Sequence, residues 1–209
     1  GINLRGLMSH LACGDIPSHP LNRQQAETFT QICQALDPTL PRSLLNSAGM
    51  VSMPDLMMDV VRPGLALYGI EPIPERPIGL KPVMSMTAKV IQIRQLQAGD
   101  AISYGASFVA KETMRIAVVS AGYADGIPRQ LSNRACAIYN KERLPITGRV
   151  CMDYTMLDVT HSAIQEGDWV AFWGEQLKAN EVASVIDSIS YTLFTGLGTR
   201  VQRLTTGSD

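Results

Sequence analysis

The chain has 209 residues, which is enough for one large domain or two smaller ones, and 45% of them are hydrophobic while 18% are charged. Its formal net charge is −1 and it has no basic run, which argues against nucleic acid and anionic membranes as partners. No apolar stretch approaches the roughly 20 residues of a membrane span, and the first residues lack the pattern of a secretory signal. A cytoplasmic protein is therefore expected.

The cysteines and histidines do not form a metal-binding pattern. The four cysteines are scattered without C-x-x-C spacing, and the three histidines do not cluster with them. Such a set is typical of reduced thiols in a cytosolic protein, so no metal site is expected. These residues are Cys13, Cys33, Cys136 and Cys151, together with His10, His19 and His161.

Residues 1–80 alternate short apolar runs with helix-like segments. The run at 2–10 suits a strand buried on both faces, and two further strands are expected within 42–50 and 53–70. Residues 19–36 have apolar side chains at helical spacing, namely Leu21, Ala26, Phe29, Ile32, Cys33 and Leu36. This alternation predicts parallel strands covered by helices. Three strands are too few to close a barrel or to fill a doubly wound sheet.

A proline-rich segment separates two regions with different patterns. Residues 71–82 contain four of the chain's 12 prolines and are typical of a linker. After them come β-rich pieces joined by short turns, which predict an antiparallel sheet or a small barrel. One helix is expected at 179–189.

Several residues could serve chemistry, although each alone has an ordinary explanation. A tyrosine at a strand end, such as Tyr104, is often an amphipathic packing residue. Arg62 before Pro-Gly could form a surface ion pair, Ser47 could cap a turn, Gly64 could serve only the backbone, and Met152 could fill the core. Single motifs therefore do not decide the function.

The order of the motifs is more specific than any one of them. SHLA, NSAG, VRPGLALYG, SYGA, GYADG, GRVCMD and SYTLFTGLGTRV follow one another from residue 9 to residue 201. This succession resembles the C-terminal part of bacterial alanine racemases, over essentially the whole chain. The resemblance implies that 1–80 is the C-terminal portion of a pyridoxal-phosphate-binding (β/α)8 barrel, with its last strands and helices, and that 81–209 is the antiparallel β domain that follows it.

The resemblance also implies an activity. Members of the family are isomerases that interconvert L- and D-alanine with pyridoxal 5′-phosphate, work as cytoplasmic homodimers and supply D-alanine for peptidoglycan. Alanine is thus the expected small-molecule substrate.

The cofactor contacts implied by the resemblance come from both regions. Ser47, the Gly64 and Leu65 amides and the Tyr191 hydroxyl resemble the family's phosphate contacts. Arg62 resembles the arginine that bonds the pyridine nitrogen, and His10 the histidine that supports this arginine. Ser43 departs from the pattern, because some members have a histidine there.

The substrate contacts implied by the resemblance lie in the second region. Tyr104 resembles the tyrosine that exchanges a proton on the face of the L-enantiomer, in the other subunit's site. The Met152 N–H resembles the contact to the substrate carboxylate, and Tyr123 and Tyr191 resemble the gate against larger amino acids. Three residues resemble those at the outer entrance to the family's active site, namely Arg129, Arg149 and Ile189.

The family's cofactor-binding lysine has no counterpart in this chain. Residues 1–80 contain no lysine, and none of the five later lysines stands in a matching motif. The chain also has no start methionine and opens on an apolar run. A piece of a longer or split enzyme, inactive by itself, is therefore expected. The five residues are Lys81, Lys89, Lys111, Lys141 and Lys178.

Alternative functions remain open from the sequence. A serine or broad-specificity racemase differs by little, since one hydroxyl is a small change for a pocket. Related decarboxylases place a different cysteine motif where this chain has GRVCMD. A non-catalytic binding or assembly β module would gain no turnover when the missing part is restored. The β region is expected to carry most of the stability, because Leu7, Val60 and Leu65 flank a sheet of few strands.

Overall fold

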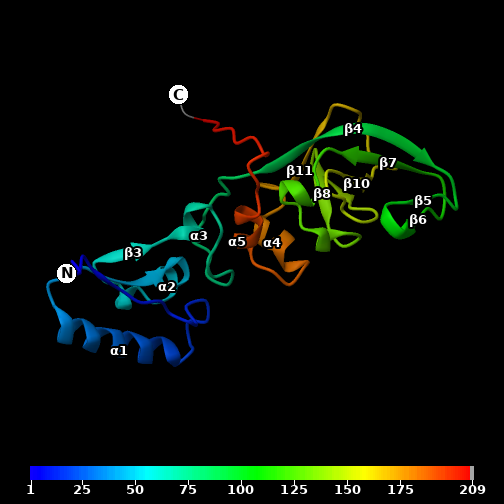
Figure 1. The fold of residues 1–209 in the computed structure, drawn as a ribbon. Coiled ribbons are helices and arrows are strands. Elements are labelled where there is room, and N and C mark those ends of the chain that lie inside the picture. The colour runs from blue at the N-terminus through cyan, green and yellow to red at the C-terminus, as the bar shows by residue number, and fades with distance from the viewer. Residues whose placement is uncertain (208–209) are drawn as a thin grey trace. The chain divides into compact units, whose positions relative to one another are not determined.

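The computed structural model describes residues 1–207 and divides the chain into two compact units (Figure 1). The first unit is Gly1–Val83 and the second begins at Met84. Among the described residues, no helix combines the length and the apolar character needed to cross a membrane.

The first unit is built on a short parallel sheet. Its strands lie in the order β1-β2-β3, with Leu7 opposite Arg42 and Asn46 opposite Arg62. The expected parallel β/α pattern is therefore seen. In chain order its elements are β1 (Leu7–Met8), α1 (Leu21–Leu36), β2 (Arg42–Asn46), α2 (Ser47–Ser52), η1 (Pro54–Leu56), β3 (Val60–Arg62) and α3 (Gly64–Leu67).

The core of the first unit lies between α1 and the central strand. Leu44 and Leu45 of β2 are fully buried and cluster with Phe29 and Cys33 of α1. The buried residues of α1 recur at intervals of three and four, which places them on one face of the helix. The central strand and one helix face thus supply most of this core.

Two expectations for the first unit are wrong in detail. The first strand has only two residues and is not buried on both faces, because Met8, which faces the opposite side of the sheet from Leu7, is 69% exposed. Ile32 and Leu36 of α1 are also exposed: Ile32 falls beside the buried stripe, and Leu36 is the last residue of the helix, beyond the buried positions.

The second unit is dominated by a six-stranded sheet in the order β10-β7-β4-β11-β8-β9, and every strand pair in it is antiparallel. A bridge between Ile146 and Leu157 links the segment after β9 to β10, so the two edges of the sheet approach each other. The β-rich prediction is confirmed. The strands are β4 (Met86–Leu96), β7 (Met114–Val119), β8 (Cys136–Tyr139), β9 (Glu142–Pro145), β10 (Thr155–Asp158) and β11 (Trp169–Trp173).

Smaller elements complete the second unit. Strands β5 (Ala101–Ile102) and β6 (Phe108–Val109) form a separate ribbon around a 3-10 turn, η2 (Tyr104–Ala106). The core includes fully buried Phe172 and Trp173 of β11. The remaining elements are η3 (Tyr123–Asp125), η4 (Arg129–Leu131), α4 (Ala179–Ser184) and α5 (Ser190–Thr195).

Candidate functional site

The first unit gathers candidate residues at the carboxyl ends of its strands. β2 ends at Asn46 and passes directly into α2, while β3 ends at Arg62 and passes through Pro63 into α3. Because the strands are parallel and Asn46 lies opposite Arg62, these chain segments meet at one edge of the sheet. Such an edge is where parallel β/α folds bind ligands.

Ser47 links the two helix starts at this edge. Its side chain is almost fully buried, and its Oγ accepts a hydrogen bond of 3.1 Å from the Ala66 N–H. Gly64 and Leu65 open the same short helix as Ala66. Since the first N–H groups of a helix have no acceptor within it, the Ser47 hydroxyl lies beside amides that need a partner.

Arg62, the last residue of β3, is held by groups of β2 and of the segment that follows β1. Its guanidinium donates to the Ser43 Oγ and Leu44 carbonyl of β2, at 2.5 and 3.2 Å. It also donates to the Ser9 carbonyl after β1 at 2.8 Å, and the His10 Nδ1 lies 3.2 Å away. Ser43, the position that departs from the family pattern, thus contacts the arginine directly. The structure brings His10 and Arg62 together, as expected.

Tyr104 lies in an irregular turn of the second unit. Its side chain is 71% exposed, and the turn follows β5 directly. The preceding residue, Ser103, has φ 68° and ψ 169°. This backbone region is almost restricted to glycine and costs about 1–3 kcal/mol for other residues.

The Tyr104 turn is joined to the GRVCMD segment, residues 148–153. The Ser103 Oγ donates to the Arg149 carbonyl at 3.0 Å and accepts from the Arg149 N–H at 2.9 Å. Gly148 has φ 81°, and a Cβ on it would lie 2.8 Å from the Ser103 Cβ. A side chain at position 148 would therefore push this pair of segments apart.

Tyr123 and Met152 are brought together by backbone contacts. The Tyr123 N–H donates to the Cys151 carbonyl at 2.9 Å, and the Ala124 N–H donates to the Met152 carbonyl at 3.0 Å. A Cβ on Gly122 would lie 2.3 Å from the Cys151 oxygen, so this approach requires glycine. The GYADG and GRVCMD segments therefore form one surface.

An arginine near the C-terminus ties the same two segments together. The Arg200 Nε lies 2.8 Å from Asp125 of GYADG, and its Nη2 lies 2.7 Å from Asp153 of GRVCMD. The other oxygen of Asp125, which is mostly buried, accepts the Gly122 N–H at 2.9 Å. Hydrogen bonds to charged groups of this kind are the stronger ones in proteins.

Tyr191 lies on α5 of the second unit, whereas the other candidate cofactor residues lie in the first unit. Partial burial raises the pKa of its phenol above the ordinary value. The hydroxyl therefore stays protonated and can donate a hydrogen bond to an anion. Of the entrance candidates, Arg129 lies in η4 and Ile189, which is exposed, precedes α5.

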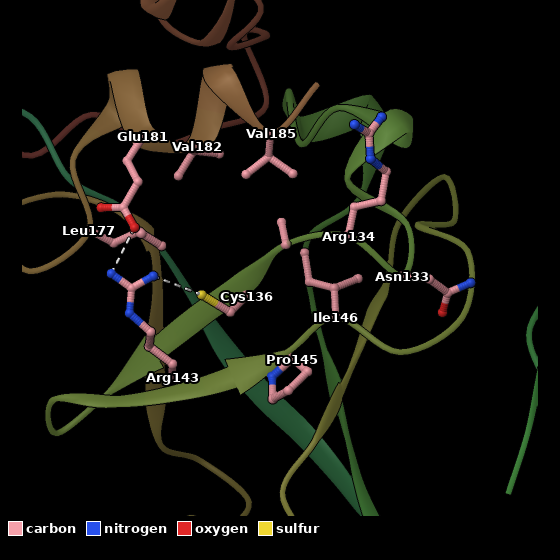
Figure 2. Close-up of a pocket in the computed structure, with 11 residues that line it drawn as sticks. Asn133, Arg134, Cys136, Arg143, Pro145, Ile146, Leu177, Glu181, Val182 and Val185 are labelled. Carbon is pink, nitrogen blue, oxygen red and sulfur yellow. Dashed lines mark hydrogen bonds and ion pairs between the residues drawn. The ribbon is translucent and has the colours of Figure 1, made fainter. Parts of the chain in front are cut away.

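A cavity of about 340 Å³ in the second unit lies next to the GRVCMD segment, since Asn133 of its wall accepts the Gly148 N–H at 2.6 Å (Figure 2). Its walls come from β8, β9 and α4, and none of the candidate site residues lines it. Arg143 donates to the Cys136 Sγ at 3.8 Å and pairs with Glu181 at 2.7 Å. Burial raises the pKa of the Cys136 thiol, which favours its protonated and less nucleophilic form.

Sequence reasoning missed the residues that support the candidate phenols. Ser103, Asp125, Asp153 and Arg200 all lie inside the quoted motifs, yet no role followed for them from the sequence. The available signal was an aspartate in each of two motifs, Asp125 in GYADG and Asp153 in GRVCMD. Their partner is visible only once the fold places Arg200 between them.

The chain is similar to solved structures from one class of enzymes. The structure of alanine racemase from Bartonella henselae with covalently bound pyridoxal phosphate matches 97% of this chain and 57% of its own, with a TM-score of 0.90 and 36% identity. Biosynthetic alanine racemase from Pseudomonas aeruginosa matches with a TM-score of 0.86 and 37% identity, over 97% of this chain and 57% of its own. Proteins of this class are racemases, which are isomerases.

Family models identify the family itself. The model for the alanine racemase N-terminal domain matches residues 1–72, and that for the C-terminal domain matches residues 83–205. The chain belongs to the alanine racemase family. Its curated relatives include alanine racemase of Hahella chejuensis, 41% identical over 98% of this chain, and the biosynthetic enzyme of Agrobacterium fabrum, 39% identical over 94%. The chain spans 56% and 54% of these two relatives, about half their length.

Proposed function

We propose that this chain is the later part of an alanine racemase, which interconverts L- and D-alanine with pyridoxal 5′-phosphate when its missing part is present. The observation that carries the proposal is the match of both domain models, in order, along nearly the whole chain. Supply of D-alanine for peptidoglycan in the cytoplasm is the physiological role that goes with this activity.

The proposed domain organisation follows the same division. Residues 1–80 would supply the last strands and helices of a (β/α)8 barrel, and residues 81–209 the β domain. The parallel order β1-β2-β3 supports the first assignment, and the six-stranded antiparallel sheet supports the second.

The strand-end residues of the first unit fit pyridoxal phosphate chemically. The Ser47 hydroxyl and the Gly64 and Leu65 amides offer donors suited to a phosphate, and the Tyr191 hydroxyl would add another. Bound pyridoxal phosphate would supply an electron sink for the α-carbon of the amino acid.

Arg62 is assigned to the pyridine nitrogen, with His10 behind it. Its contacts to Ser43, Ser9 and Leu44 leave the guanidinium little freedom to turn. A guanidinium keeps its protons, so Arg62 would donate a hydrogen bond and leave the ring nitrogen largely unprotonated. This limits electron withdrawal and favours return of the proton to the α-carbon over side reactions.

Tyr104 is assigned the proton transfer on one face of the α-carbon. Racemisation needs one group on each face, one to remove the proton and one to return it. The Met152 N–H would hold the substrate carboxylate, and Tyr123 and Tyr191 would narrow the site to small side chains. Tyr104 would act in the site of a second subunit, which makes the working protein a homodimer.

The group on the opposite face is assigned to a lysine outside this chain. The five lysines of the sequence all follow residue 80, and none stands in the family's motif. The 209-residue chain alone is therefore proposed to be inactive.

The test compares this chain with a joined chain, in which the preceding segment of the Agrobacterium fabrum relative is fused before Gly1. Both are assayed with pyridoxal phosphate for interconversion of L- and D-alanine, and of serine in parallel. Turnover of alanine by the joined chain only is expected. Preference for serine would make serine the substrate instead of alanine. A folded but inactive joined chain would favour a binding or assembly module. Turnover by the 209-residue chain would overturn the lysine assignment.

A further inference from the structure

A serine with glycine-like backbone angles stands immediately before the proposed acid–base residue. Ser103 has φ 68° and ψ 169°, an arrangement that glycine adopts far more readily than serine. A residue other than glycine in this strained conformation points to a role for its side chain. The strain lies one residue from Tyr104 rather than in a distant turn.

The Ser103 side chain makes a two-way link to Arg149, and its Oγ also lies 4.0 Å from the Cys151 Sγ. Its Oγ donates to the Arg149 carbonyl at 3.0 Å and accepts the Arg149 N–H at 2.9 Å. Glycine could hold the backbone angles of Ser103 but could not make either bond. The opposite glycine at position 148 leaves room for this hydroxymethyl group, because its Cβ would meet the Ser103 Cβ.

The link connects the Tyr104 turn to the segment that carries Met152. Tyr104 is 71% exposed, so little of its side chain is held by packing. The short turn that it opens is closed by a bond from the Ala106 N–H to the Ser103 carbonyl at 3.2 Å. Ser103 thus attaches this exposed turn to the 148–153 segment by hydrogen bonds. Gly105 of the turn lies against the Arg149 guanidinium, where a Cβ would be 3.3 Å from Nη1.

We propose that Ser103 is a positioning residue that fixes the Tyr104 phenol relative to the substrate contact at Met152. The inference rests on the proposed function. Ser103 itself exchanges no proton with substrate. Its hydroxyl fixes the position of the backbone from which the Tyr104 side chain extends. Because misplacing a reacting group by about 1 Å can cost on the order of 100-fold in rate, loss of the link slows turnover without weakening substrate binding.

The test uses Ser103→Gly, which relieves the backbone strain while deleting both bonds. In the joined chain kcat is expected to fall about 10- to 100-fold with KM changed less than about threefold. In the 209-residue chain the Arg149 amide is expected to exchange with deuterium at least about tenfold faster, while the melting temperature stays within about 4 °C.

Lys141→Gly is the matched control. Lys141 also has a positive φ of 73° but lies in the exposed turn between β8 and β9. This variant should leave kcat and Arg149 exchange unchanged. Parental kcat in Ser103→Gly, unchanged Arg149 exchange, or collapse of the fold would each overturn the proposal. If the parent joined chain has no racemase activity, the proposed function fails instead, and the exchange measurement still reports on the link.

Discussion

The two units support their candidate residues in different ways. In the first unit Ser47 and Arg62 stand where strands become helices, so the parallel sheet itself sets their places. In the second unit Tyr104, Tyr123 and Met152 stand on loops joined by a few bonds between distant segments. The first arrangement depends on an intact sheet, whereas the second depends on individual side chains. Single substitutions should therefore affect the two units differently.

The largest expected difference concerns catalysis in the second unit. Tyr104→Phe in the joined chain removes the proposed proton-transfer group and should lower alanine racemisation by about 10²- to 10⁴-fold. Tyr139→Phe is the matched control, because the Tyr139 hydroxyl bonds Asp168 at 2.9 Å and has no proposed contact with substrate. Steady-state kinetics of both variants make the comparison, and equal losses would contradict a special role for Tyr104.

The next effect should separate the two cores. Leu44 of β2 and Leu157 of β10 are both fully buried, and truncating either to alanine should cost about 2–5 kcal/mol of unfolding free energy. Hydrogen exchange by mass spectrometry should show Leu44→Ala loosening the first unit and Leu157→Ala the second.

The same exchange measurement on the unsubstituted chain compares the stability of the two units. The first unit should exchange faster, since its strands have only two, five and three residues while β4 has 11. Equal protection of residues 1–70 and the β strands would refute the prediction that the β domain carries most of the stability.

A smaller effect tests the arginine that ties the second-unit loops. Arg200→Met leaves the mostly buried Asp125 carboxylate without its cation and should lower unfolding free energy by about 1–3 kcal/mol. Arg94→Met, an exposed arginine on β4, should change it by less than about 0.5 kcal/mol. Chemical denaturation compares the two, and similar losses would show that Arg200 does not clamp the loops.

The smallest effects should appear at the extremes of pH. Hydrogen bonds from Arg23 and Arg42 lower the pKa values of Asp55 and Asp59 in the first unit. Their stabilisation is present above the ordinary pKa of 3.8 and is lost as the pH falls below it. Protection factors in the first unit, which compare each exchange rate with the intrinsic rate at the same pH, should therefore fall in acid, and Asp59→Asn should weaken this fall.

Alkali should act on the second unit instead. Burial raises the pKa of Tyr191, so the fold favours the neutral phenol. The stability from this group is complete below the ordinary pKa of 10.0 and is lost as the pH rises through the higher folded value. The unfolding free energy, measured by chemical denaturation, should fall there, and Tyr191→Phe should weaken this fall. An unchanged alkaline response in that variant would assign the effect to other groups.

Features that depend on neighbouring residues could be predicted from the sequence. The alternation of apolar runs with helix-like segments predicts the parallel strands. Arg62, Pro63 and Gly64 are correctly predicted at a strand end, because the end of a strand and the start of a helix both depend on neighbouring residues. The Tyr104 turn was likewise expected at a strand end.

Features that depend on strand order could not be predicted. Ser103 and Arg149 are 46 residues apart, and Arg200 and Asp153 are 47 apart. Their contacts follow from the order of the six-stranded sheet and from which loops it brings together. The first strand is predicted within residues 2–10, but its short extent and its exposed face depend on its neighbours in the sheet and are not visible in its composition.

The most direct test of the account follows the α-hydrogen of each enantiomer of alanine in deuterated water. The parent joined chain should exchange the α-hydrogen of both enantiomers. Tyr104→Phe should lose exchange of L-alanine but still exchange D-alanine without inverting it, because only the group on the opposite face remains. Exchange of L-alanine at the parental rate in this variant would contradict the assignment of Tyr104.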